Sequence, residues 1–381
     1  MSYECDGDMI KVIYGDYIDC YNAWSKDKTI RHVSASGGII TSIINYLLKN
    51  RFYDVAFCVD TYDYKEQLVT MPITRDDLMS DWENSNIPKS RYLPVSHENA
   101  ILYIKQNEDK KVVLIGTSCA IKMFRNVIYS LKLQESNYLL IGLFCDRVFN
   151  YNIEKYFEDS LCRGKTINHF HFKNKESGGW PGNMKFYLDE GEILYKDKSE
   201  RTKVKDYFMP ERCMYCVDKL NVCADISVGD NYTDQNSNIL GSNSVIIRTT
   251  QGLEAWNIAK GELEYERLDI DKLHKAQYLE GRLHNLYYSI LKENIIKKEL
   301  GVETFYNHNA STIEESLNYK FSWRTLLKRI RVGQLYDSKP DIIHLKLRED
   351  NKRAKSYKKI INMAERRWYL LIQFIMRIFQ K

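Results

Sequence analysis

The sequence predicts an α/β protein: an N-terminal α/β domain with a mostly parallel sheet, a smaller α+β domain, and a helical, basic C-terminal extension. Three observations predict this order. Short apolar runs alternate with helical periodicity at first, strand-like alternation with turns follows, and helical patterns rich in Lys and Arg come last. We place the domains at 1–150, 151–270 and 271–381, in line with ~100–200 residues per domain.

The N-terminal domain is expected to contain amphipathic helices between buried strands. Isoleucine and leucine recur at helical spacing from Ile39 to Leu48, which predicts a helix that ends near Asn50. Further helical patterns follow Thr117 and Asn152. Short apolar runs typical of buried parallel strands lie at 54–59, 112–115 and 138–144.

The middle domain is expected to rest on antiparallel strands. The run 166–172 alternates in strand fashion, and the runs 184–188 and 193–195 flank an acidic turn, which indicates a hairpin or meander. We expect two further strands at 224–228 and 244–248 and assign them to this same domain.

The composition bounds the class of protein. With 44% hydrophobic and 28% charged residues, the chain is not a collagen, a disordered protein or a polytopic membrane protein. No window approaches the ~18 uninterrupted apolar residues of a spanning helix. The first residues carry acids where a signal peptide carries bases. Nine cysteines then indicate a reducing, cytoplasmic setting in which thiols serve metals or catalysis.

A glycine-rich turn stands directly before the helix that begins at Ile39. It consists of Ser36, Gly37 and Gly38. The glycines would let a ligand approach the backbone, and the unpaired N–H groups of a helix N-terminus favour phosphate. An ordinary capped helix is the alternative interpretation.

Five cysteines have settings that suit a metal site. Cys119 and Cys145 each follow a buried strand, so both should lie at the carboxyl edge of one sheet, where open α/β sheets hold ligands. Cys213 and Cys216 form a C-x-x-C pair, which suits metal or iron–sulfur ligation. Because the pair supplies only two ligands, the sparest set of four thiolates joins all four residues, with Cys223 as a substitute. A thioredoxin-like redox pair is the other interpretation of the C-x-x-C motif.

At these residues the sequence resembles the beta subunit family of coenzyme F420 hydrogenases and dehydrogenases, which are flavin and iron–sulfur oxidoreductases. The matching segments keep the family's order over about Ile18 to Gly252. They are Tyr21 to Ala23, Ser36 to Thr41, Gly116 to Cys119, Gly142 to Cys145, Cys213 to Cys216, Ala224 to Asp230 and Gly241 to Thr249. We interpret the chain as a polysaccharide-biosynthesis-type member of the family.

The resemblance implies two cofactors, FAD and one 4Fe–4S cluster. The implied cluster ligands are Cys119, Cys145, Cys213 and Cys216. The implied flavin or phosphate contacts are Ser36, Gly37, Gly38, Arg91 and Thr117. Two departures occur beside one ligand, since Ser118 and Ala120 stand where many relatives have proline and glutamine. The ferredoxin-like cysteine repeats of some members are missing, which implies one cluster rather than three.

The C-terminal extension carries its own charge. Residues 319–381 contain 17 Lys and Arg against 5 Asp and Glu, a surplus of 12, whereas the whole chain has a net charge of +5. Apolar residues from Trp368 to Phe379 share one helical face flanked by bases, and the stretch is too short to span ~30 Å of hydrocarbon. This pattern indicates a helix on an anionic membrane surface, and the segment Trp323–Leu335 repeats it. Docking on the protein itself or in a homodimer is the alternative, and nucleic acid is a poorer partner because no binding fold accompanies the charge.

The function expected from the sequence is an FAD- and 4Fe–4S-dependent oxidoreductase that couples hydride transfer to one-electron transfer. We expect it to be cytoplasmic, peripheral at the inner face of the cell membrane, and active in polysaccharide or glycolipid biosynthesis. No residue marks its electron partner, which could be a deazaflavin, a nicotinamide or a ferredoxin. His32, His169 and His171 are candidate proton donors. The alternatives are a cofactor-free scaffold and a zinc-stapled interaction protein of the same fold.

Overall fold

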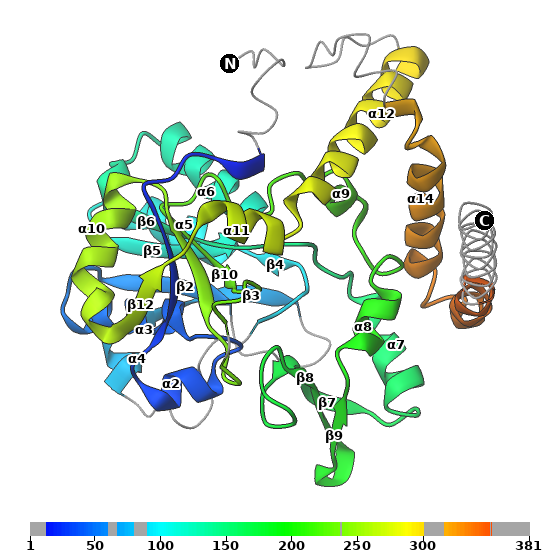
Figure 1. The fold of residues 1–381 in the computed structure, drawn as a ribbon, viewed down its shortest axis with the longest axis horizontal. Coiled ribbons are helices and arrows are strands. Elements are labelled where there is room, and N and C mark those ends of the chain that lie inside the picture. Colours follow the sequence, from blue (N-terminus) through cyan, green and yellow to red (C-terminus); the bar gives the residue numbers. More distant parts are fainter. Residues whose placement is uncertain are drawn as a thin grey trace, which may run out of the picture.

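A nine-stranded sheet forms the centre of the molecule (Figure 1). The computed structural model describes residues 13–59, 67–79, 90–236, 238–300, 316–350 and 352. In sheet order, the strands are β12 (Leu263–Arg267), β1 (Asp19–Ser25), β11 (Asn243–Ile247), β10 (Ile226–Asp230), β6 (Tyr138–Leu143), β5 (Val112–Thr117), β2 (Val55–Val59), β3 (Leu68–Thr74) and β4 (Val95–Ser96). The central strands β10, β6, β5 and β2 are parallel, and β11 and β3 adjoin this block antiparallel. The predicted α/β class is confirmed.

Helices cover both faces of this sheet. Of these helices, α3 (Ile39–Lys49) and α10 (Thr250–Ala259) pack on one face, and α5 (Glu98–Gln106) and α6 (Ser118–Ser130) on the other. Other helices of the described residues are α2 (Lys28–Val33), α4 (Arg75–Met79), α7 (Asn152–Tyr156), α8 (Ser199–Val204), α9 (Glu211–Met214), α11 (Ile270–Ala276), α12 (Arg282–Leu300) and α14 (Lys320–Gln334). On β5, Val113 and Ile115 pack toward α3 and α10, whereas Val112 and Leu114 pack toward α5 and α6. A strand buried on both faces needs apolar residues throughout, which is why apolar runs marked the central strands.

The strands after residue 225 correct the expected division of the chain. We expected 224–228 and 244–248 to lie with the middle domain, but β10 and β11 belong to the nine-stranded sheet together with β12. They join strand β1, which pairs antiparallel with both β11 and β12. The expectation followed chain order, whereas strands pair wherever their hydrogen bonds and buried faces match.

A three-stranded antiparallel sheet forms the smaller unit at the bottom of Figure 1. Its strands are β7 (Ile167–Asn174), β8 (Asn183–Leu188) and β9 (Ile193–Lys196). The predicted hairpin is confirmed, since β8 pairs antiparallel with β9. Its core is aromatic, because the rings of Phe157, Phe170, Phe172 and Phe186 are all buried and lie in contact.

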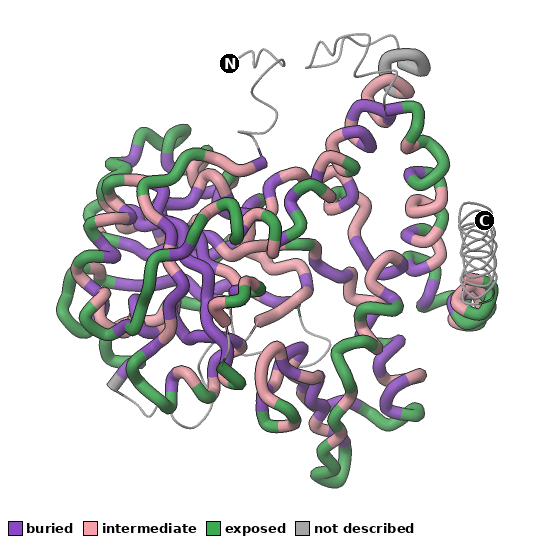
Figure 2. The backbone as a smooth tube through the Cα atoms, in the orientation of Figure 1, coloured by how far each residue is buried: buried purple, intermediate pink, exposed green. Residues whose placement is uncertain are grey.

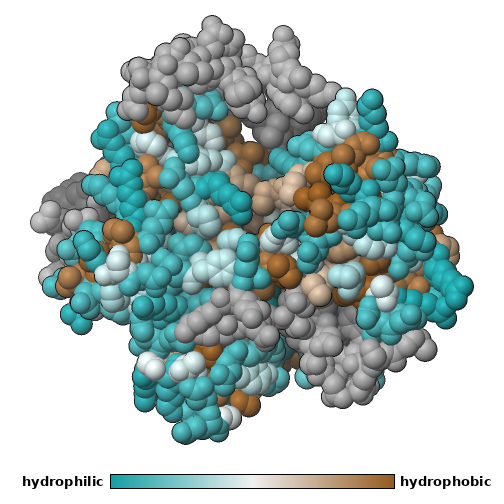
Figure 3. Space-filling model, turned by 180° about the vertical axis from the view of Figure 1, so that it is seen from behind, coloured by the Kyte–Doolittle hydropathy of each residue, from teal (hydrophilic) through white to brown (hydrophobic). Residues whose placement is uncertain are grey.

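Helices α12 and α14 stand beside the sheet with α9 packed against them (Figure 1). Trp323 and Ile330 of α14 are buried, and the buried interior appears as purple tube in Figure 2. The expectation that Trp323–Leu335 offers an apolar face to a membrane is therefore corrected: its apolar side packs on the protein. The predicted helix from Trp368 to Phe379 lies outside the described residues. Within those residues, no helix combines the length and apolarity needed to cross a membrane, and the back of the molecule is largely hydrophilic with scattered hydrophobic patches (Figure 3).

One buried acid makes the stability of this fold depend on pH. Glu154 of α7 is 4% exposed, and burial, with Glu158 adding to it, raises the pKa of its carboxyl to about 8. The folded protein therefore retains a proton that the unfolded chain releases above its ordinary pKa, so stability should fall as the pH rises toward 8. We expect Glu154→Gln to raise the free energy of unfolding by about 2–4 kcal/mol at pH 8 and little at pH 4.5. Urea unfolding at both pH values measures this, with the exposed Glu190→Gln as control; an equal difference at both pH values would contradict it.

Candidate functional site

The carboxyl edge of the parallel strands brings two of the singled-out cysteines together. Thr117 at the end of β5 pairs with Leu143 at the end of β6, which in turn pairs with Val228 of β10. Cys119 and Cys145 each follow two residues after those strand ends. Sequence reasoning placed both at one sheet edge, and the register agrees.

Asn221 holds the two strand ends in place. Its buried amide Nδ2 donates to the carbonyl oxygens of Gly116 at 3.0 Å and Leu143 at 3.3 Å. A Cβ added at Gly142 would lie 2.4 Å from the Asn221 side chain. The glycine is therefore needed for this close approach, which gives the motif before Cys145 a physical reason.

Cys213 of the C-x-x-C pair lies in the short helix α9, and Cys216 follows two residues after the end of that helix. Helix α9 begins after Pro210, whose carbonyl accepts the Cys213 N–H at 3.0 Å, and the Cys216 N–H approaches the Cys213 carbonyl at 3.4 Å. The chain then turns back toward the sheet edge, because the Cys145 N–H donates to the Lys219 carbonyl at 2.9 Å. One hydrogen bond thus joins the two cysteine segments.

Four thiols share one neighbourhood. Burial is the main cause that raises the pKa of the Cys145 thiol, and the charges of three nearby thiols raise that pKa further. These neighbours are Cys213, Cys216 and Cys119. Cys119 is exposed, with its Sγ 3.3 Å from the Thr117 Oγ1, and the other three cysteines are partly exposed. In the described part of the chain, no three His, Cys, Asp or Glu side chains are placed to hold one metal ion.

Cys223 lies in a different charge setting from this quartet. Burial raises the pKa of its thiol, while the cations Lys122 and Arg125 lower it. Its carbonyl accepts a hydrogen bond from the Arg125 Nε at 3.1 Å. The remaining described cysteines, Cys20, Cys58 and Cys162, are buried in the hydrophobic cores.

A buried arginine that the sequence reasoning missed joins the backbones of Cys145 and Cys216. Arg282, at the start of α12, is 5% exposed and donates to the carbonyls of Cys145 and Cys216, each at 3.3 Å. It also binds the Asp146 carboxylate at 2.8 Å. Burial opposes ionisation of that carboxylate, but the guanidinium groups of Arg147 and Arg282 lower its pKa to about 2. No local pattern marks Arg282, because its partners lie far away in the sequence.

The Ser-Gly-Gly turn is packed between strands. The Ser36 Oγ donates to the Ser242 carbonyl at 2.8 Å and is buried. A Cβ at Gly37 would lie 2.7 Å from the Asn243 side chain, and Gly38 has φ +81 at the N-cap of α3. The Ser36 side chain and the two glycines therefore serve close packing. A ligand would contact the residues around this turn rather than the turn itself.

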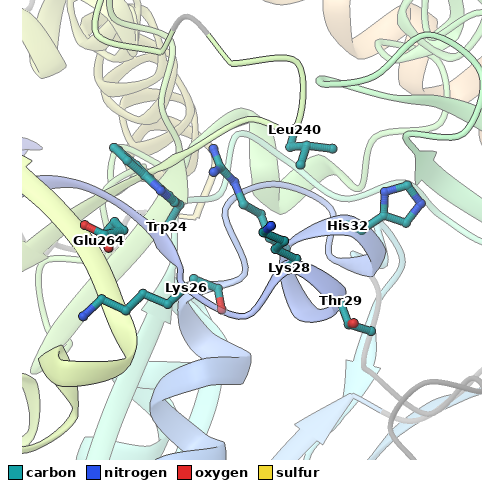
Figure 4. Close-up of a pocket in the computed structure, with 9 residues that line it drawn as sticks. Trp24, Lys26, Lys28, Thr29, His32, Leu240 and Glu264 are labelled. Atoms are coloured by element: carbon teal, nitrogen blue, oxygen red, sulfur yellow. The ribbon is translucent and has the colours of Figure 1, made fainter.

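Those surroundings include a cavity of about 730 Å³ beside α2 (Figure 4). Trp24, Lys26, Lys28, Thr29, Arg31, His32, Leu240 and Glu264 are among the residues that line it. The Arg31 guanidinium lies 5.1 Å from the Trp24 ring and donates to the Gly241 carbonyl at 3.1 Å. The cavity thus combines four basic side chains with an aromatic ring, and it was not identified from the sequence.

A buried ion pair occupies the same sheet edge. Lys173 of β7 binds the carboxylate of Asp230 at the end of β10, and Tyr232 donates to that carboxylate at 3.1 Å. Burial alone would lower the pKa of Lys173, but Asp230 and the nearby Tyr92 raise it overall. Arg91, adjacent to Tyr92, is half-buried. The ion pair between Lys173 and Asp230 therefore joins the three-stranded sheet to the nine-stranded sheet at this edge.

Two family models match the chain over well over half its length. Both describe the coenzyme F420 hydrogenase/dehydrogenase beta subunit: the model of its N-terminal part matches residues 20–97, and the model of its C-terminal part matches residues 109–271. The chain belongs to this family. The resemblance seen in the sequence is confirmed, and α12 and α14 lie beyond both matched ranges.

Individual relatives of this F420 family member are distant. Coenzyme F420 hydrogenase subunit beta of Methanosarcina barkeri is 24% identical over 299 residues, which cover 76% of this chain and 92% of that protein. The coenzyme F420-dependent sulfite reductase of Methanocaldococcus jannaschii is 25% identical over 261 residues, or 64% of this chain and 37% of that protein. A chain of the F420-reducing NiFe hydrogenase complex from Methanosarcina barkeri superposes with a TM-score of 0.56 at 21% identity, covering 74% of this chain and 94% of that one. The last comparison shows a shared fold, and the family supports an oxidoreductase role.

Proposed function

We propose that this protein is an oxidoreductase that holds FAD and one 4Fe–4S cluster and couples hydride transfer to one-electron transfer. The observation that carries the proposal is the convergence of Cys119 and Cys145 with the C-x-x-C pair. Four cysteines from three distant segments meet at the sheet edge where α/β proteins hold ligands.

The chemistry of the four thiols fits a cluster better than a single ion. Thiolates are the usual ligands of iron–sulfur clusters. A cubane is wider than one ion and keeps its cysteines farther apart. The buried Arg282 would place a positive charge beside the anionic cluster.

The position of the basic cavity fits FAD. Trp24 lies in β1, and the register from Ala23 through Asn243 to Asp230 puts the cavity at the same sheet edge as the cysteines. Strand β1 is three strands from β6 in the sheet order, or about 14 Å at ~4.8 Å per strand. Arg31 and the two lysines of the cavity would hold the pyrophosphate of FAD.

The chain's own residues would orient the cofactors and exclude water. A bound flavin supplies two-electron hydride chemistry, which the one-electron cluster divides into single steps. The cavity's cations would bind phosphate, and the Trp24 ring offers a face for stacking. Cys145 is partly exposed and Cys119 is exposed, so both would contribute a ligand near the surface of the protein.

The visible spectrum of anaerobically purified protein tests the proposal. We expect flavin bands near about 450 nm with a broad shoulder near about 400 nm, together with bound iron and sulfide. Colourless protein with zinc would support the zinc-stapled interaction protein instead. Colourless protein without metal would support the scaffold.

The hydride partner is tested by asking which donor bleaches the bound flavin. Because two relatives are named for coenzyme F420, a deazaflavin is the first donor to try, with a nicotinamide and a reduced ferredoxin beside it. The donor that bleaches the 450 nm band at about stoichiometric concentration identifies the partner class.

We also propose that the C-terminal segment binds an anionic membrane surface, in support of a role in polysaccharide or glycolipid synthesis. This rests on the apolar face and flanking bases from Trp368 to Phe379. Full-length protein should float with vesicles that contain anionic lipid, and protein truncated before Glu365 should not. Unchanged flotation after the truncation would contradict the membrane role.

A further inference from the structure

A second cavity, of about 390 Å³, opens between α12 and α14 close to the cysteine quartet. Asn285 and Tyr288 of α12 line it, as do Phe321 and Arg329 of α14. The Asn285 side chain also donates to the Cys216 carbonyl at 2.6 Å. A single side chain therefore links the wall of this cavity to the C-x-x-C turn.

The inner side of α14 contacts the same turn. Its buried Trp323 has its indole Nε1 3.4 Å from the hydroxyl of Tyr215, which lies between the two cysteines of the pair. Helix α14 thus forms the layer between the C-x-x-C turn and the surface.

The outer side of α14 is basic and exposed. Lys320, Arg324, Lys328 and Arg331 follow one another at intervals of four, four and three residues, which puts them on one helical face. All four are exposed, and none forms an ion pair with another residue in the described ranges. Three large apolar side chains border them: Leu317, Phe321 and Leu335, which are 53%, 81% and 48% exposed. Figure 2 shows this outer edge of α14 as exposed.

We infer that the basic face of α14 is the docking site for a small acidic one-electron carrier protein. The inference rests on the proposed function, because the electron needs a cluster at the four cysteines. In the step, one electron leaves the reduced centre of the carrier and enters the oxidised cluster, or the reverse, and no atom is transferred. The four cations attract an acidic partner and orient it, and the exposed apolar side chains give it a dry contact.

A carrier protein fits this face better than a membrane does. A helix that lies in a membrane interface buries its apolar side in lipid. The apolar side of α14 is already buried against the protein through Trp323 and Ile330. What remains for a partner is a charged face with a few apolar side chains at its border.

The test compares two charge-reversed variants of the full-length protein. The first carries Lys320→Glu, Arg324→Glu, Lys328→Glu and Arg331→Glu. The control carries the same change in charge at four exposed lysines of the α/β unit: Lys49→Glu, Lys105→Glu, Lys111→Glu and Lys132→Glu. Stopped-flow spectroscopy measures cluster reduction by a reduced acidic ferredoxin at low and high salt, and by dithionite, a small reductant that needs no docking site.

We expect the first variant to lose at least about tenfold in the second-order rate constant with ferredoxin at low salt, while the control loses little. The wild-type rate should itself fall with salt, which tests the inference even if the variant fails to fold. Equal rates for wild type and folded first variant, or a wild-type rate that ignores salt, would overturn it. A membrane role would be indicated instead if anionic vesicles bound the wild type but not the first variant, while the ferredoxin rate stayed the same in both. That result would also overturn the inference. If dithionite reveals no cluster in the wild type, the proposed function fails first, and this inference fails with it.

Discussion

Replacing Cys145 with serine is expected to remove the iron from the protein. The Cys145 thiol lies among the other three thiols of the quartet, and a serine oxygen is a poor ligand for iron that prefers soft thiolates. We expect about four iron atoms and four sulfides per chain in the wild type and close to none in Cys145→Ser. Iron and sulfide analysis of anaerobically purified protein measures the loss, and the broad absorbance shoulder should disappear with it.

Cys223→Ser is the matched control for this experiment. Cys223 is also partly buried and lies only seven residues after Cys216, but it faces Lys122 and Arg125. We expect the control to keep its iron. Full iron content in Cys145→Ser, or loss in the control variant alone, would show that the quartet is assigned wrongly.

Lys173→Met is expected to destabilise the protein by about 3–5 kcal/mol, because it leaves the Asp230 carboxylate buried without its cation. The side chains of this pair are only 6% and 13% exposed, so solvent can replace the lost interaction poorly. The midpoint of urea unfolding measures the change.

The double variant Lys173→Met/Asp230→Asn separates the charge from the packing. It removes both charges, so it should be more stable than Lys173→Met alone. The solvent-exposed pair of Lys165 and Glu192 serves as control, and Lys165→Met should leave the midpoint nearly unchanged. If the double variant is no more stable than Lys173→Met, the loss comes from packing and not from an unpaired charge.

Apolar patterns located the centre of the sheet but missed four of its strands, β1, β3, β4 and β12. The central strands β5 and β6 are apolar throughout because both of their faces are covered. Strand β1 escaped notice because its buried position Asn22 is polar. The Asn22 side chain is satisfied by hydrogen bonds to Glu266 and Asn231, each at 2.8 Å, from segments distant in the sequence.

The amphipathic pattern of α14 was seen, but not what its apolar side would contact. A helix with one apolar face can pack on its own protein or lie on a membrane, and periodicity is the same in both cases. The burial of Trp323 against the C-x-x-C turn decides between them.

By itself the sequence determined the α/β class, the strand ends that carry Cys119 and Cys145, and the family to which the chain belongs. The fold class, the strand ends and the family can be predicted because they depend on residue patterns and short motifs within single segments of the chain. Only the tertiary structure decided which side chains surround the quartet, such as Arg282, and that the basic cavity shares its sheet edge. Such contacts depend on strand register and on burial across the whole fold, and no local segment of the chain contains both partners.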